Sequence, residues 1–199
     1  MRKMILSAAF VVAATAALAQ APADTVRVRA TLENVSVPML TAKARDGAEM
    51  KIKLADNAPV NEVVKASLAD IKENSYIAVT AMPQPDGSQK AVAILIFPEA
   101  MRGVGEGFRP WDLEPNSTMT NATVGQQVAG TDGQTVTVKY KDGDKKILVT
   151  PATIIVTYKK SAASELKAGQ KIFVAAAKKL DDGTLEAPNV AYGDVGVWR

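Results

Sequence analysis

Residues 40–54 read LTAKARDGAEMKIKL, two runs of alternating residues on either side of the pair Asp46-Gly47. Asp-Gly between alternating runs is a strong signal for a β-hairpin, because it supplies the positive φ angles of a type I′ turn. The same pair recurs at Asp86-Gly87, Asp132-Gly133, Asp142-Gly143 and Asp182-Gly183. We therefore predict an antiparallel all-β protein made of tight hairpins.

The chain contains two copies of one pattern, since Asp46-Gly47 and Asp86-Gly87 each recur 96 residues later. Ser67 and Asp70 predict a capped helical turn between the third and fourth strands of the first copy. The first copy predicts strands over residues 26–32, 40–45, 48–54, 76–82 and 90–97, and the second over residues 119–124, 135–141, 145–150, 171–177 and 185–192.

Three strands, a short helical connection and two more strands form the element order of an OB barrel. With its Leu-Lys-Ala-Gly turn at residues 166–169, the pattern resembles a bacterial exported tandem OB-fold (small β-barrel) domain family of unknown function. In the first copy Asn74 stands where Gly169 does, and asparagine tolerates the left-handed conformation. The resemblance implies two tandem five-stranded OB-like barrels joined by an ordered linker containing Gly, Pro and Trp. One continuous β-sandwich is the alternative.

The first nineteen residues have the pattern of an export signal, in which Arg2 and Lys3 precede an apolar stretch. The small residues at 17–19 predict cleavage before Gln20; an uncleaved membrane anchor is the alternative. We expect an exported protein, in the periplasm, whose mature chain has no membrane span. The predicted segments are a signal peptide at 1–19, OB-like repeats at 20–98 and 118–199, and a linker at 99–117.

The chain has no histidine and no cysteine. It therefore lacks the commonest general base, the commonest metal ligand, the thiol nucleophile and the disulfide. The formal net charge of +3 falls by two when Arg2 and Lys3 leave with the signal, so nucleic acid is not an expected partner. We predict a protein that is not an enzyme and uses no metal or cofactor, with an enzyme of unrecognised type as a remote alternative.

A basic face is the first candidate site. By strand parity six cationic side chains of the first three strands point outward, on the face where OB folds bind oligonucleotides and oligosaccharides. They are Arg27, Arg29, Lys43, Arg45, Lys51 and Lys53. This cluster predicts a site for an anionic ligand: a glycan, a headgroup or an acidic partner. A merely solvated sheet face is the alternative, since the face has no aromatic stacking platform.

The second candidate is the linker segment that contains Phe108, Arg109, Trp111 and Asp112. It predicts a recognition element, or alternatively an interdomain plug with Trp111 buried and Arg109 paired locally with Asp112. The fifth strand of the first copy is apolar on both faces, and we expect the linker aromatics to cover it. The function hypotheses are an envelope binding or scaffold protein using the basic face, or a structural protein–protein adaptor using the linker and the apolar strand. The expected partners are an unknown envelope protein or an anionic polymer.

Overall fold

The computed structural model describes residues 25–130, 133–194 and 196, so the predicted export signal lies outside the described residues. The described residues form fourteen strands and three single-turn 3-10 helices. The strands are β1 (Thr25–Ser36), β2 (Met39–Ala44), β3 (Glu49–Leu54), β4 (Val60–Lys65), β5 (Tyr76–Pro83), β6 (Gln89–Ile96), β7 (Gly107–Pro110), β8 (Thr118–Gly130), β9 (Gly133–Tyr140), β10 (Gly143–Val149), β11 (Ile154–Ser161), β12 (Lys171–Lys179), β13 (Leu185–Ala187) and β14 (Val190–Tyr192). The helices are η1 (Leu68–Asp70), η2 (Glu99–Met101) and η3 (Ala163–Glu165).

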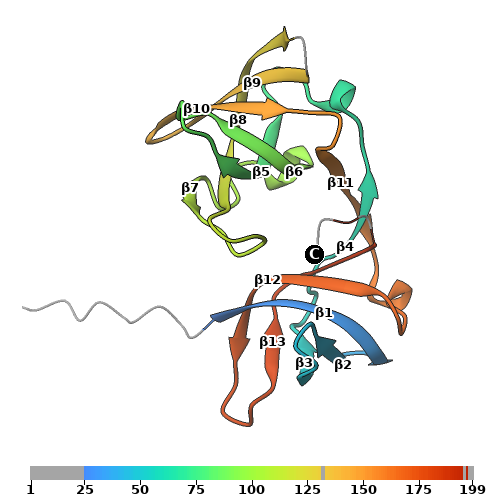
Figure 1. Ribbon diagram of the computed structural model, residues 1–199. Coiled ribbons are helices and arrows are strands. Elements are labelled where there is room, and N and C mark those ends of the chain that lie inside the picture. The colour runs from blue at the N-terminus through green and yellow to red at the C-terminus, as the bar shows by residue number, and fades with distance from the viewer. Residues whose placement is uncertain (1–24, 131–132, 195, 197–199) are drawn as a thin grey trace, which may run out of the picture.

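The strands close two five-stranded barrels, which lie one above the other in Figure 1. The first barrel runs β1-β2-β3-β13-β12, and β12 pairs back to β1. The second runs β5-β6-β10-β9-β8, and β8 pairs back to β5. The prediction of an all-β protein with five-stranded OB-like barrels is therefore confirmed.

Each barrel combines strands from both sequence copies. The first barrel takes β1, β2 and β3 from the first copy but β12 and β13 from the second. The second barrel joins β5 and β6 to β8, β9 and β10. This finding corrects the expectation that residues 20–98 and 118–199 each close a barrel, because like strands of two similar copies can pair across the copies as well as within them. The second barrel is contiguous in the chain, and the two chain ends together build the first.

Two strands that the sequence patterns did not predict carry the chain between the barrels. β4 and β11 pair antiparallel to each other, with Tyr158 opposite Val63, and lie side by side at one edge of the molecule (Figure 1). β11 continues the sheet along β6, and β14 continues it along β4. β6 is therefore paired along both edges, by β5 on one side and by β10 and β11 on the other.

The two barrels have separate apolar interiors, and a third cluster lies between them. Ile52 and Ile172 are fully buried in the first barrel, and Ile94 and Ile147 in the second. The third cluster contains Val63, Ala93, Val156 and Ala191. The alternating residues of β6 thus face two apolar regions, which explains why that strand is apolar on both faces. The linker aromatics are not in this third cluster. The β6 face that contains Ala93 is therefore covered there by residues of β4, β11 and β14.

The Asp-Gly turns at residues 46–47, 86–87 and 182–183 connect strands as predicted, but their geometry differs from type I′. Gly47 has a φ of 89°, its N–H donates to the Ala44 carbonyl, and positive φ is confined to the glycine. The Asp46 carboxylate accepts a hydrogen bond from the Ala48 N–H. These features define a three-residue loop in which a type I turn precedes a left-handed glycine. The turns at Gly87 and Gly183 repeat this pattern, and Asp132 lies outside the described residues.

The linker is ordered and attached to the second barrel. β7 pairs with β8 along residues 107–110. Arg102 donates to the Asn74 carbonyl at 2.7 Å, and the Trp111 N–H donates to the Ser117 carbonyl at 2.8 Å. Within the described ranges, no helix combines the length and the apolar character needed to cross a bilayer.

Candidate functional site: a pocket between the barrels

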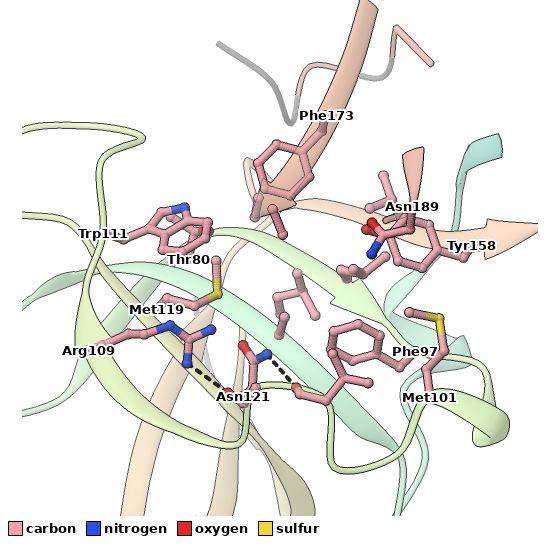
Figure 2. A pocket seen from close by; sticks show the side chains of 18 of the residues that line it. Thr80, Phe97, Met101, Arg109, Trp111, Met119, Asn121, Tyr158, Phe173 and Asn189 are labelled. Carbon is pink, nitrogen blue, oxygen red and sulfur yellow. Dashed lines mark hydrogen bonds between the residues drawn. The ribbon is translucent and has the colours of Figure 1, made fainter. Parts of the chain in front are cut away.

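A pocket of about 240 Å³ lies where the two barrels, the linker and β11 meet. Figure 2 shows the side chains that line it, which come from β1, β5, β6, β8, β11 and β12, mostly from their outward faces, together with the linker and Asn189. Those strand residues point outward because alternate residues of the same strands fill the barrel interiors. The pocket is therefore a product of how the barrels are placed together.

Most of the pocket wall is apolar and aromatic. The Phe97 ring centroid lies 5.4 Å from that of Tyr76 and 6.2 Å from that of Tyr158, and Phe173 and Met119 line other parts of the wall. Burial in these surroundings raises the pKa of Tyr158 to about 12, because the low-dielectric wall disfavours the phenolate. The pocket is thus an environment that disfavours isolated charge.

One end of the pocket is cationic. Three guanidinium groups surround the Trp111 ring, with Arg27 at 3.7 Å from its centroid and Arg29 and Arg109 each at 5.7 Å. Cations over an indole face are attracted by the ring quadrupole. Trp111 and Arg109 belong to the linker, whereas Arg27 and Arg29 belong to β1 of the other barrel.

Asp112 joins the two barrels by accepting from both β1 arginines. Its Oδ2 lies 2.8 Å from Arg27 Nη1, and its Oδ1 lies 2.8 Å from Arg29 Nη2. The hydrogen bond from Arg29, followed by the one from Arg27, holds the pKa of Asp112 well below its ordinary value of 3.8. Asp112 is therefore ionised at neutral pH and neutralises part of the cationic cluster.

Arg109 has no carboxylate partner among the described residues. Its Nη1 donates to the Gly105 carbonyl at 2.7 Å. Burial lowers the pKa of Arg109, and the positive charge of Arg27 lowers it further, although the group remains protonated. The Arg109 guanidinium is a partly buried cation on the pocket wall, with N–H donors left over.

Asn121 adds an unsatisfied acceptor to the same end. The residue is only 4% exposed, and its Nδ2 donates to the Val104 carbonyl at 2.9 Å. The Tyr76 hydroxyl donates to the same carbonyl at 3.2 Å. The buried Oδ1 of Asn121 has no hydrogen-bond partner. A buried acceptor without a partner destabilises the folded state unless another group donates a hydrogen bond to it.

The structure divides the predicted basic face into two parts. Arg27 and Arg29 contact the linker segment, so two candidates that were separate in the sequence share one location. Lys43, Lys51 and Lys53 remain exposed on the outer face of the first barrel, and Arg45 is exposed in the turn after β2. Acidic residues accompany them, with Glu49 opposite Lys43 and Glu186 opposite Lys53 in the strand register.

The linker residues also take separate positions. Arg109 and Asp112 do not pair with each other, which corrects the local pairing expected for an interdomain plug, because the β1 arginines reach Asp112 instead. Trp111 is partly buried between cations. Phe108 is 41% exposed and lies away from the pocket, with the Lys145 ammonium 4.6 Å from its ring centroid.

Sequence reasoning missed the wall residues Asn121, Phe97, Tyr158 and Phe173. Asn121 had a usable signal, because residues 118–124 are otherwise apolar or Thr, and an amide in the middle of such a run is a buried polar group in need of partners. Tyr158 lies on β11, which the patterns did not predict. Across residues 25–130, 133–194 and 196, no three Asp, Glu, His or Cys side chains gather as a metal site.

No protein-family model matches the chain, and no curated protein or solved structure shows significant similarity to it. The function must therefore be argued from the site itself.

Proposed function

We propose that the protein is a non-catalytic binding protein of the cell envelope, and that its ligand occupies the pocket between the barrels. The observation that carries this proposal is the pocket of about 240 Å³, apolar along most of its wall and polar at one end. Binding sites for small molecules typically combine an apolar wall with a few convergent polar groups. The envelope location and the relation to exported bacterial tandem OB domains belong to the same proposal, and the signal-like residues 1–19 support them.

A neutral, apolar fluorescent probe such as N-phenyl-1-naphthylamine tests this proposal. Ala175 is exposed and lines the pocket, whereas its exposed neighbour Ala176 does not line it. We expect saturable binding of one probe per chain, weakened about tenfold or more by Ala175→Trp, because the indole fills the pocket. The matched variant Ala176→Trp should bind the probe like the wild-type protein. Absence of saturable binding, or equal loss in both variants, would overturn the pocket as the binding site.

The open part of the basic face supports a second candidate function, the binding of an anionic polymer. Lys43, Arg45 and Lys171 line a shallow hollow beside β1, which gives these cations a defined location. Binding there should weaken steeply as salt increases, since exposed charges are screened within about 10 Å at 0.1 M salt. Probe binding in the apolar pocket should barely respond to salt, so retention on heparin at increasing salt separates the two candidates.

A further inference from the structure

The polar end of the inter-barrel pocket has unsatisfied hydrogen-bonding groups of both kinds. Arg109 makes one hydrogen bond, to the Gly105 carbonyl, although a guanidinium group has five N–H donors. Arg29 binds Asp112 through Nη2, and its buried Nε has no partner. The unsatisfied acceptor is the buried Oδ1 of Asn121. A ligand that completes this end needs an acceptor for the arginines and a donor for Asn121.

The charge at this end calls for an anion. Arg27, Arg29 and Arg109 lie within 5.7 Å of the Trp111 ring centroid, and Asp112 is the carboxylate in contact with two of them. Positive charge therefore exceeds negative charge around Trp111. An unneutralised cation is unfavourable against an apolar wall, and a planar carboxylate matches the fork of a guanidinium group.

The side chains of Arg109 and Asn121 lie close together. A Cβ atom placed on Gly105 would stand 3.3 Å from Arg109 Nη2 and 3.2 Å from Asn121 Nδ2, so both side chains converge on that glycine. Figure 2 shows the two side chains at the same end of the pocket, below Trp111, with the aromatic rings of Phe97 and Tyr158 on the other side. One small ligand head group can therefore meet both Arg109 and Asn121, while its apolar part contacts the rings.

We infer that the pocket binds an apolar carboxylic acid with a hydrogen-bond donor on the carbon next to the carboxylate, as in a 2-hydroxy acid or an N-acyl amino acid. The carboxylate accepts from Arg109, the neighbouring O–H or N–H donates to Asn121 Oδ1, and the apolar chain lies along the aromatic wall. This inference rests on the proposed function, because it assigns a ligand class to the same pocket.

Displacement of the bound naphthylamine probe tests the ligand class. The competitors are 1-decanol, decanoate, 2-hydroxydecanoate and N-octanoylglycine, at pH 7.5. We expect decanoate to displace the probe at a concentration about tenfold below that of decanol, because the carboxylate makes charge-assisted hydrogen bonds. Both donor-bearing acids should act several-fold below decanoate, and the stronger of the two identifies whether a hydroxyl or an amide N–H is preferred.

Two variants assign these preferences to residues. Arg109→Met should erase the advantage of decanoate over decanol, and Asn121→Leu should erase only the advantage of the donor-bearing acids over decanoate. Decanol is the internal control, since damage to the fold would weaken its binding too. Lys167→Met removes a positive charge from an exposed turn of the other barrel, and it should change neither preference.

The outcomes separate this inference from the function on which it rests. If the probe binds but decanol and decanoate displace it at the same concentration, the carboxylate assignment is overturned and the binding function stands. Equal action of decanoate and the donor-bearing acids would overturn the role of Asn121. A preference for decanoate that survives in Arg109→Met would overturn the role of Arg109. Failure of the probe itself to bind would remove the proposed function.

Discussion

At the scale of single residues, Asp112 is the side chain that fastens the two barrels to each other. It extends from a linker that is paired to β8, and it binds Arg27 and Arg29 on β1 of the other barrel. The same contact holds Arg27 over the Trp111 ring. Asp112 thus positions Arg29, which lines the polar end of the pocket, and Arg27, which contacts Trp111.

Asp112→Asn should lower the free energy of unfolding by up to about 1 kcal/mol, because ion pairs of this exposure contribute little more. Urea unfolding measures the change. Asp194→Asn is a matched control, since Asp194 also forms an ion pair at 2.8 Å, with Lys171, but has a single cationic partner. A larger loss in the control than in Asp112→Asn would contradict the bridging role.

The contribution of Asp112 to the free energy of unfolding should also depend on pH. Its pKa is lower in the folded protein than the ordinary value of 3.8, so the folded state binds its proton less readily than the unfolded chain does. The stabilisation is therefore fully present above pH 3.8 and is lost as the pH falls below 3.8 through the folded-state pKa. The difference in unfolding free energy between wild type and Asp112→Asn should be constant from pH 7 to 5 and shrink towards pH 2. A difference that grows on acidification would contradict this assignment.

At the scale of elements, the Asp-Gly turns show what local sequence determines. In the turns at Asp46, Asp86 and Asp182 the Asp carboxylate accepts from the backbone N–H two residues ahead and the following glycine takes the positive φ, so the turn is encoded in consecutive residues. At Gly87 the cost of backbone strain can be measured without a steric clash. A Cβ atom there would meet nothing within 4 Å, although φ is 82°.

Gly87→Ala should therefore destabilise the protein by about 1 kcal/mol through backbone strain alone. Gly87→Asn is the matched variant, and it should recover part of the loss because asparagine tolerates the left-handed region. Thermal unfolding of the three proteins provides the measurement. Equal stability of Gly87→Ala and wild type would show that the turn relaxes to another geometry.

The strands that sequence analysis missed depend on partners far away in the chain. β4 and β11 have mixed sequences and lie far apart in the chain, so no tight turn joins them, and each is held by the other and by neighbouring strands. The site shows the same limit. The sequence identified Arg27 and Arg29 as one candidate and Trp111 and Asp112 as another, but not their contact, which follows from how the barrels are placed. Asn121 was missed because strand alternation alone does not show which outward face becomes buried.

At the scale of the whole molecule, the exchange of strands changes which fragments can fold. Residues 67–153 contain every strand of the second barrel together with the linker. Residues 20–98 contain three strands of one barrel and two of the other.

We predict that a fragment of residues 67–153 folds as a monomer, while a fragment of residues 20–98 does not form a stable monomeric barrel. The first retains a closed interior, but the second leaves the β1 and β3 edges without β12 and β13. Circular dichroism, amide NMR spectra and size-exclusion chromatography distinguish these states. A folded monomer from residues 20–98 would show that the first copy can close on itself, contrary to the pairing described above.

The division of the first barrel between the two chain ends has a consequence for the order of events during synthesis. β3 ends at Leu54, and its partner β13 begins only at Leu185. A ribosome must therefore complete all of the second barrel before the edges of β1 and β3 can be covered. In that interval the early strands are exposed to incorrect pairing, since open strand edges are templates for association. The second barrel, already closed by then, brings β4 and β11 together and shortens the search by which the last strands find the first.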